Sequence, residues 1–412
     1  MSNKMDTVKT LLPKLRFPEF ENSPAWKKTP LEDAVSPVVR QVEKPENSYT
    51  GLGIRSHGKG TFLKPFESPE KNAMEYLYEV QSDDLIVNIT FAWEGAIAIV
   101  KQGDSGALVS HRFPTYTFNR DVAIPEFFQY VILDKRFIYN LGVISPGGAG
   151  RNRVLNKNDF LKLTVSVPST AEQQKIADCL TSLDDLIAAQ SQKVAALQAY
   201  KKGLMQNLFP AEGESVPRLR FPEFESAGEW EEKTLGKAAT FYNGKAYKQE
   251  ELLEHGKYRV LRVGNFFTNN NWYYSDLELD ETKYCENGDL LYAWSASFGP
   301  RIWHGEKVIY HYHIWKVVAE KNINKDFLYL VLDFETEKIR SQSANGLGLL
   351  HITKATIENW KCMFPKDPNE QQRIAELLSA LDEEISAQGE SLAALKVHKR
   401  GLMQGLFPSG GG

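Results

Sequence analysis

The sequence predicts an α+β fold. Two mixed α/β blocks, related by a pseudo-two-fold axis, are joined by two long helices that form an antiparallel coiled coil. Three observations predict it: the length of the chain, an internal duplication and a heptad spacing of apolar residues. A chain of 412 residues is longer than a domain with a single hydrophobic core usually is. Its hydrophobic content of 42% and aromatic content of 11% are typical of globular proteins.

Two segments of the chain occur twice. The sequence PKLRFPEFE at 13–21 returns as PRLRFPEFE at 217–225, with eight of nine residues identical. A longer segment at 172–210 returns at 370–408 with 22 of 39 residues identical and no gap. Average residue frequencies would give about two or three such matches. The chain is therefore a tandem duplication.

The duplicated segments bracket two blocks that have diverged much further. Short echoes between the blocks remain at 54–55 and 261–262, at 84–85 and 289–290, and at 145–150 and 343–348. We expect one body plan carrying two different surfaces. The predicted division is an N-terminal segment with the first short motif (1–20), a first block (21–168), a central helix (169–210), a linker with the second motif (211–224), a second block (225–367), and a distal helix with a tail (368–412).

Both longer repeats begin like helices. Ser169 or Thr170 can cap the first helix, with Glu172 following. Asp367 can cap the second, with Pro368 at its first position and Glu370 completing a capping box. Trp26 and Trp230 follow the two copies of the short motif and are predicted to be core anchors.

Apolar residues in both helices follow a narrow 4-3 spacing for more than four heptads, roughly 50 Å of helix. The alternative is that each helix packs on its own block, but such helices carry a wider apolar face. Antiparallel pairing would place Ile176 opposite Leu406; parallel pairing stays open. The seam consists of Ile176, Leu180, Leu183, Ile187, Gln190, Val194, Leu197, Lys201, Leu204 and Leu208, and of Ile374, Leu378, Leu381, Ile385, Gln388, Leu392, Leu395, Lys399, Leu402 and Leu406.

Composition narrows the function. Cys179, Cys285 and Cys362 lie far apart, so neither a disulfide framework nor a zinc site is predicted. The start of the chain has no apolar leader and no stretch is long enough for a bilayer, so we expect a cytoplasmic protein without a membrane partner. A net charge of −4 is unusual for a free-standing nucleic-acid binder.

Catalytic motifs are missing from the sequence. Residues 53–61 have the GxxxxGK frame of a phosphate loop, but Gly60 stands where magnesium needs a hydroxyl, so a surface turn is predicted. There is no HExxH or GxSxG motif. The chain also has no Pro-Pro pair, which the motif of an adenine methyltransferase requires. We predict no catalytic residue, no metal ligand and no cofactor in this chain.

The doubled motifs, LRFPEF followed by Trp, then EQQ-IA with LxxLD, then GLMQ-LFP, resemble the specificity (S) subunits of type I restriction–modification systems, the HsdS family. The resemblance covers the full chain in order. It implies that each block is a target recognition domain reading one half of a bipartite, asymmetric double-stranded DNA site. It also implies that the helices space the two halves and dock two modification subunits, which use S-adenosylmethionine to methylate adenine at N6. Restriction subunits, with ATP and Mg²⁺, complete such complexes.

Two other classes of function stay open: a protein-interaction scaffold and a self-sufficient enzyme. If the chain binds DNA, the glycine-rich stretch at 145–153 is the best candidate for the contact. Its glycines let the backbone approach a phosphate, and its Arg and Asn side chains can hydrogen-bond to bases. The run from Tyr292 to Ser297 is a weaker candidate. The predicted DNA-binding residues are Arg151, Asn152 and Arg153, then Arg55, His57 and Lys59 in the first block, and Arg262, Asn265, Asn345, His351 and Lys354 in the second.

Overall fold

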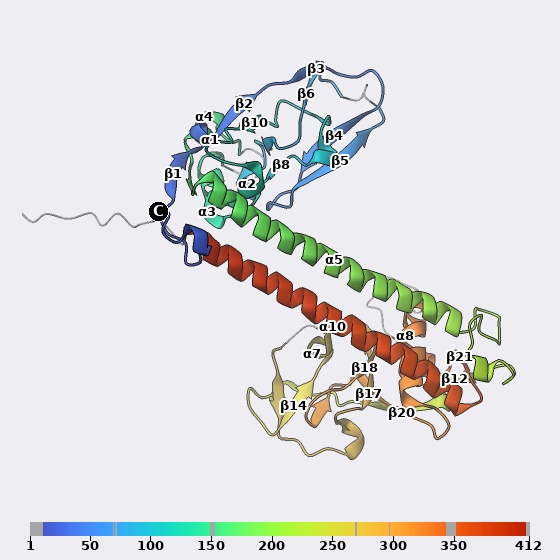
Figure 1. Ribbon diagram of the computed structural model, residues 1–412. Coiled ribbons are helices and arrows are strands. Elements are labelled where there is room, and N and C mark those ends of the chain that lie inside the picture. Colours follow the sequence, from blue (N-terminus) through green and yellow to red (C-terminus); the bar gives the residue numbers. More distant parts are fainter. Residues whose placement is uncertain are drawn as a thin grey trace, which may run out of the picture. The chain divides into compact units, whose positions relative to one another are not determined.

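The computed structural model describes residues 11–68, 70, 72–148, 153–267, 270–295, 297–342 and 352–408. They form two compact units, Met1–Gln190 with Ser391–Gly412, and Ser191–Glu390. Each unit therefore holds one block together with half of each long helix, α5 (Thr170–Leu208) and α10 (Pro368–Leu406) (Figure 1).

The first unit combines a four-stranded sheet of order β2-β10-β7-β8, a five-stranded sheet of order β3-β6-β9-β4-β5 and the pair β1-β11. Its helices are α1 (Leu31–Ala34), α2 (Pro125–Val131), α3 (Lys135–Val143), α4 (Lys157–Lys162) and the first half of α5. Its strands are β1 (Lys27–Pro30), β2 (Val35–Val38), β3 (Gln41–Glu43), β4 (Tyr49–Ile54), β5 (Thr61–Phe66), β6 (Tyr76–Glu79), β7 (Leu85–Val87), β8 (Ile97–Ile99), β9 (Leu108–Val109), β10 (Thr115–Phe118) and β11 (Thr164–Val167).

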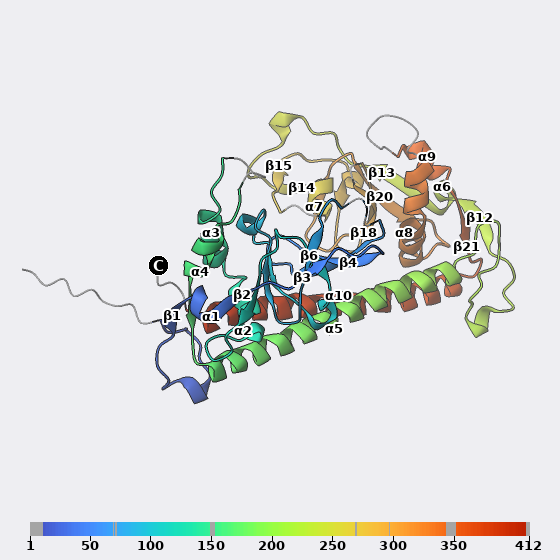
Figure 2. The same cartoon turned by 90° about the horizontal axis from the view of Figure 1, so that it is seen from above.

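The second unit has sheets of order β13-β20-β17-β18 and β15-β14-β19-β16 and the pair β12-β21. Its helices are α6 (Leu235–Ala238), α7 (Val263–Phe267), α8 (Lys325–Gln342), α9 (Lys354–Glu358) and the first half of α10; α8 packs against β18 (Figure 2). Its strands are β12 (Glu231–Thr234), β13 (Ala239–Asn243), β14 (Tyr258–Leu261), β15 (Tyr273–Ser275), β16 (Tyr284–Cys285), β17 (Leu290–Ser295), β18 (Ser297–Ile302), β19 (Val308–Tyr310), β20 (Ile314–Ala319) and β21 (Lys361–Phe364).

The two units share the topology of their first four-stranded sheet, and the first unit has one strand more in its other sheet. Strand order β2-β10-β7-β8 corresponds to β13-β20-β17-β18, and each unit has one parallel strand pair, β4 with β9 and β14 with β19. Asp84 and Asp289, which precede β7 and β17, each accept a backbone N–H at 2.8 Å, from Gln81 and Glu286. The expectation of a repeated body plan of mixed α and β structure is confirmed.

A buried ion pair explains the repeated short motif. In the first unit, the Arg16 guanidinium donates to both carboxylate oxygens of Glu172, at 2.9 and 2.7 Å, and to the carbonyl of Ser23 at 2.7 Å. The indole N–H of Trp26 donates to the same carboxylate at 3.3 Å. The Arg16 and Glu172 side chains are 8% and 1% exposed. The motif is thereby fixed to the first turn of α5.

The second unit repeats this ion pair. Arg220 donates to both carboxylate oxygens of Glu370 at 2.8 and 2.7 Å, and the Trp230 indole donates to Glu370 at 3.2 Å. The predicted capping box at Glu370 is therefore wrong, because the carboxylate binds a guanidinium instead of the backbone at its own helix end. Trp26 and Trp230 are both 3% exposed, as predicted for core anchors.

The glutamine after each of these glutamates is also buried. Gln173 accepts the N–H of Ile124 at 3.1 Å and donates to the carbonyls of Val122 and Pro168. Gln371 accepts the N–H of Asn324 at 2.9 Å in the corresponding place. The side chain thus joins the start of a long helix to the start of α2 or α8.

The far end of each long helix enters the core of the other unit. Phe407, after α10, stacks on Phe127 at 5.4 Å and meets Trp26 edge-on at 5.8 Å. Phe209, after α5, stacks on Phe327 at 5.6 Å and meets Trp230 edge-on at 6.0 Å. The phenylalanine of each repeated LFP ending therefore packs against the aromatic side chains of a unit's core. We call these two residues, Phe407 and Phe209, the aromatic plugs.

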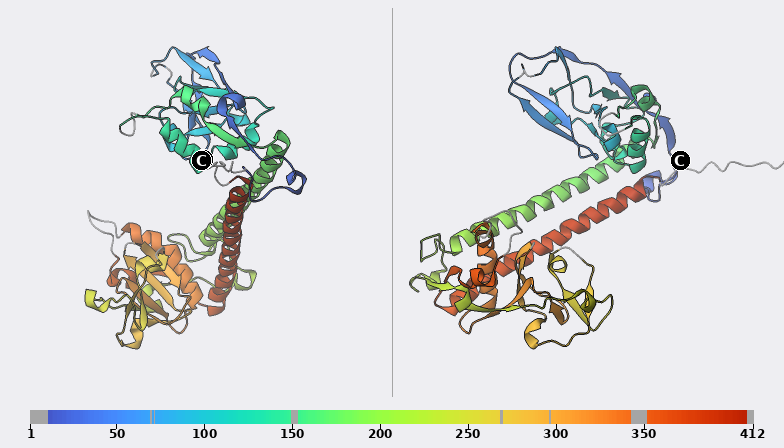
Figure 3. Two further views of the ribbon diagram at one scale, coloured as in Figure 1. Left: turned by 90° about the vertical axis from the view of Figure 1, so that its left-hand side faces the viewer. Right: turned by 180° about the vertical axis from the view of Figure 1, so that it is seen from behind.

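Within each unit the half-helices pair antiparallel, and the parallel alternative is wrong. Ile176 shares a core cluster with Leu406, as the antiparallel register requires. Lys201 pairs with Asp382 at 2.7 Å in the second unit, and Lys399 pairs with Asp184 in the first. Figure 3 shows the end of α10 beside the start of α5. The two lysines that interrupt the apolar seam are thus bound to carboxylates of the facing helix.

The long helices pack on the blocks only at their ends. Ile176 and Leu180 lie in the core of the first unit, and Met205 and Leu208 lie in that of the second. Between these ends, the α5 seam positions from Leu183 to Leu204 are half-buried, as in a two-helix pair. Among the described residues, no helix is both long and apolar enough to cross a bilayer.

Replacing Glu172 with Ala should lower the free energy of unfolding by about 3–5 kcal/mol, because it leaves a buried guanidinium unpaired. Glu370→Ala should have a similar effect. Urea unfolding followed by tryptophan fluorescence measures both. Lys175→Ala is the control, since Lys175 and its partner Glu19 are 50% and 46% exposed. A Glu172→Ala curve that superimposes on the control would contradict a structural role for the pair.

A cysteine pair tests the helix register. In a Cys179→Ser background, Ile176→Cys with Leu406→Cys should oxidise to an intramolecular crosslink that changes mobility on a non-reducing gel. Ile176→Cys with Ile374→Cys is the matched control, because those positions face each other only in a parallel pair. A crosslink in the control and none in the test pair would refute the antiparallel register.

Candidate nucleic-acid interface

One edge of each unit gathers three segments that are far apart in the sequence. These are the end of β7 or β17, the turn before β10 or β20, and the segment before α4 or α9. The same backbone hydrogen bonds join them in both units. Ile89 donates to the carbonyl of Arg112 at 3.0 Å, and Trp294 donates to that of His313 at 3.1 Å. The two edges are therefore structurally equivalent.

The glycine-rich segments predicted to approach DNA are anchored at these edges. Leu155 donates its N–H to the Ile89 carbonyl at 2.9 Å, and Ile352 donates to the Trp294 carbonyl at 3.4 Å. Arg151, Asn152, Asn345 and His351 themselves lie outside the described residues. Their predicted role in DNA binding stays a prediction.

In the first unit, Arg153 supports the local fold. Its guanidinium donates to the carbonyls of Gly142 at 2.6 Å and Ser145 at 3.1 Å, at the end of α3, and lies 5.1 Å from the centre of the Trp93 ring. Arginine near a helix C-terminus satisfies carbonyls that have no partner within the helix. A contact from Arg153 to DNA would therefore compete with these bonds.

Residues 55–60 form the turn of the β4–β5 hairpin. No helix follows the GxxxxGK frame, so the expectation of a turn is met. Arg55 donates to the Thr61 carbonyl at 2.6 Å and covers the Phe62 ring, whereas His57 and Lys59 are exposed. The His57 N–H donates to the Glu94 carbonyl at 2.7 Å, which holds the turn against the segment that contains Trp93.

Arg262 and Asn265 lie together after β14. The Asn265 side chain accepts the N–H of Arg262 at 3.4 Å and donates to the carbonyl of Asn271 at 2.7 Å, while Arg262 covers the Tyr273 ring at 4.2 Å. Both residues organise the connection from β14 to β15. Lys354, at the first position of α9, pairs with Glu358 at 3.4 Å and lies two residues after Ile352.

The run from Tyr292 to Ser297 divides between core and edge. Tyr292 is 0% exposed and its hydroxyl lies 3.2 Å from that of Thr336, so its predicted DNA contact is wrong. Trp294 lies at the edge, where its indole N–H donates to the Tyr312 carbonyl at 2.8 Å. His311 and His313 lie between β19 and β20.

Two residues of the edges escaped the sequence analysis as DNA candidates: Arg112 and His313. Arg112 lies three residues before the start of β10 and His313 one residue before the start of β20, and the two short turns share no sequence motif. Only the repeated hydrogen bonds from β7 and β17 show that the two positions correspond. The signal is tertiary, and one sequence does not contain it.

The His311 imidazole stands in an aromatic and cationic setting. Its ring lies 4.8 Å from that of His313 and 6.2 Å from that of Tyr247. Burial, with the nearby charges of His313 and Arg262, lowers the pKa of His311 to about 4. His311 is therefore neutral at physiological pH and stays neutral in mildly acidic solution, where an ordinary histidine would be charged.

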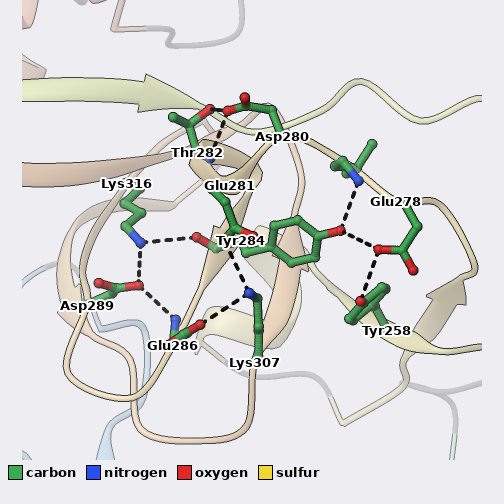
Figure 4. A network of polar contacts seen from close by, with 11 residues as sticks. Tyr258, Glu278, Asp280, Glu281, Thr282, Tyr284, Glu286, Asp289, Lys307 and Lys316 are labelled. Atoms are coloured by element: carbon green, nitrogen blue, oxygen red, sulfur yellow. Dashed lines mark hydrogen bonds and ion pairs between the residues drawn. The ribbon is translucent and has the colours of Figure 1, made fainter.

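Several acidic residues of the second unit form ion pairs within the network of polar contacts that Figure 4 shows. Lys316 binds Asp289 at 2.7 Å, and Lys307 binds Glu281 at 3.2 Å and Glu286 at 3.3 Å. The hydrogen bond that Lys307 donates to Glu281 raises the pKa of Lys307. These carboxylates and lysines form ion pairs with one another, which is a structural arrangement and not a catalytic one.

Side chains with the chemistry of an active site are not assembled in the described residues. Burial raises the pKa of the Cys285 and Cys362 thiols, so neither is a reactive thiolate. The described part of the chain has no group of three His, Cys, Asp or Glu residues that could hold a metal ion. The edges offer exposed guanidinium, imidazole and aromatic groups, which suit binding.

Comparison with known proteins identifies the same repeated unit. The model of the type I restriction modification DNA specificity domain matches residues 55–199 and 227–396, more than half of the chain. A type I restriction enzyme MjaVIII specificity subunit from Methanocaldococcus jannaschii is 24% identical over 348 residues, which cover 79% of this chain and 80% of that protein.

Two solved structures share the fold. The type I restriction-modification S subunit from M. genitalium has a TM-score of 0.65 at 17% identity, covering 97% of this chain and 100% of that one. A chain from a study of complex assembly and conformational transition of the type I R-M system has a TM-score of 0.54 at 18% identity, covering 93% and 98%.

The lowered pKa of His311 predicts how stability depends on pH. Between pH 6.5 and about 4, the unfolded chain binds a proton at His311 that the folded chain does not, so the free energy of unfolding falls as pH falls. His311→Gln should flatten this dependence in urea unfolding at several pH values. The His311 ring signal in NMR, assigned by its loss in the variant, should titrate near pH 4. A midpoint near 6.5 would contradict the burial argument.

Proposed function

Because the chain belongs to the type I restriction modification DNA specificity family, we propose that it binds a bipartite, asymmetric double-stranded DNA sequence and positions two adenine-N6 methyltransferase subunits on it. The chain is a specificity subunit. Each unit reads one half of the site with the edge formed at Arg112 or His313.

One observation carries this proposal: a single topology occurs twice, with unlike side chains at equivalent edges. A repeated fold is suited to binding two segments of one duplex, and unlike edges are suited to two different sequences. A subunit reading a symmetric site would present the same groups twice. Here Arg112 stands in one unit where His313 stands in the other.

We propose that the paired helices set the distance between the half-sites and dock the modification subunits. Leu186 and Val397 are 50% and 63% exposed on these helices, and exposed apolar side chains are suited to a partner surface. The apolar seam residues hold the helices together, so partners bind the outer faces. S-adenosylmethionine belongs to the modification subunits, and ATP and Mg²⁺ to the restriction subunits.

A net charge of −4 fits a subunit that binds DNA as part of a complex. Most affinity for any duplex comes from neutralised phosphates, whatever the sequence. In this proposal the modification subunits supply much of that charge, while this chain supplies base contacts.

Reconstitution tests the proposal. The chain, purified with its modification subunit, should methylate adenines within one defined bipartite sequence when given S-adenosylmethionine and a DNA library. The chain alone should methylate nothing. Sequencing that detects N6-methyladenine reads the outcome. Protein partners without any sequence-specific methylation would favour an interaction scaffold, and methylation by the chain alone would identify an enzyme.

Lengthening both helices should lengthen the DNA spacer. Seven residues inserted after Gln190 and seven after Gln388 preserve the heptad seam and add about 10 Å, or about three base pairs. Methylation at the original spacing should be lost, and sites that remain should keep both half-sites with the longer spacer. The same insertion in one helix alone is the control, because it mismatches the seam. An unchanged spacer would contradict the role of the helices.

A further inference from the structure

We propose that Arg112 and His313 are equivalent specificity positions, each contacting a base in its own half-site, and that Arg112 recognises guanine. This inference rests on the proposed function and deepens it. It assigns the difference between the half-sites to a change of side chain at one position of a repeated fold.

Backbone hydrogen bonds establish that the two positions are equivalent. The carbonyl of Arg112 accepts the N–H of Ile89, which follows β7, and the carbonyl of His313 accepts the N–H of Trp294, at the end of β17. The strand register agrees, because Leu85 pairs with Tyr116 and Leu290 pairs with Val317. Arg112 precedes Tyr116 by four residues, as His313 precedes Val317.

Both positions lie beside residues that follow the glycine-rich segments in the sequence. The residue that donates to the carbonyl of Arg112, Ile89, also accepts from Leu155, and Trp294 accepts from Ile352 in the same way. Leu155 comes two residues after the stretch 145–153 that is predicted to approach DNA, and Ile352 comes directly after the predicted DNA-binding residue His351. Side chains at 112 and 313 therefore stand next to the place where a close backbone approach is expected.

Arg112 is available for a ligand, unlike the buried and ion-paired Arg16. Its side chain is exposed, and its guanidinium donates at 3.3 Å to the Thr90 hydroxyl. Within the described part of the chain it forms no ion pair, whereas Arg16 and Arg40 bind Glu172 and Asp84. An exposed guanidinium in a fixed turn can bind both acceptors of guanine in the major groove.

His313 presents a different surface. Its ring is half-buried between Tyr312, at 3.9 Å, and Trp294, at 5.0 Å. An imidazole is a flat ring that cannot present two parallel N–H donors, whereas a guanidinium can. The base selected at this position of the second half-site is therefore read by different chemistry.

Methylation profiling of the complex with its modification subunit tests the inference. Wild type, Arg112→Ala, Arg112→Lys and His313→Arg are each given a DNA library with randomised half-sites. Arg112→Ala should lose about 5- to 150-fold discrimination for guanine at one base pair of one half-site, with the other half-site unchanged. Arg112→Lys should lose the same preference, because lysine lacks the two-pronged donor. His313→Arg should favour guanine at one base pair of the other half-site.

Arg120→Ala is the matched control, because Arg120 is an exposed arginine of the same unit that binds Asp83 at 2.6 Å. It should leave both half-sites unchanged. Equal loss of methylation on all sequences in Arg112→Ala would identify a phosphate contact and overturn the inference, as would an unchanged preference. If wild type methylates no defined sequence, the proposed function itself fails. A specific wild type with insensitive variants refutes this inference alone.

Discussion

Two buried ion pairs, Arg16 with Glu172 and Arg220 with Glu370, are the constraint on which the rest of the structure depends. Each fixes the N-terminal motif of a unit to the first turn of a long helix. The pair needs the tryptophan indole as well, because a buried carboxylate must have its remaining lone pairs satisfied. This explains why arginine, tryptophan and glutamate recur together in both copies. The glutamate is more than a hundred residues from the other two in the chain.

The aromatic plugs complete this arrangement. Since α5 starts in the core of the first unit and ends at Phe209 in the core of the second, each core contains residues from both long helices. The first unit needs Phe407 and Leu406 from the last helix. The folding of each block is thereby coupled to the pairing of the helices. Substitutions in the repeated segments should act on both units, while substitutions in the edge turns act locally.

The helices and the duplication could be predicted because they depend on spacing and on repeated letters, which a single sequence contains. The spacing allowed both an antiparallel and a parallel pair, and the core cluster shared by Ile176 and Leu406 in the structure selects the antiparallel one. The edges could not be predicted, because their members meet only through the sheet. Arg153 read as a DNA contact, yet it donates to carbonyls at the end of α3. Glu370 read as a capping residue, yet it binds Arg220, which the sequence places 150 residues away. In both cases the local sequence pattern is present, but the group that the side chain binds is set by contacts formed in the folded chain.

The pairing of charges also explains how an acidic chain can serve a DNA complex. Lys307 and Lys316 are bound to carboxylates in the second unit, so their charges are largely neutralised within the chain. A binding edge with little excess charge gains little from phosphates, so its selectivity depends on the fit of particular side chains to particular bases. Weak general affinity is an advantage for a specificity subunit, since it limits binding to unrelated DNA. The division of labour proposed for the complex, with charge on the partners and discrimination on this chain, follows from that balance.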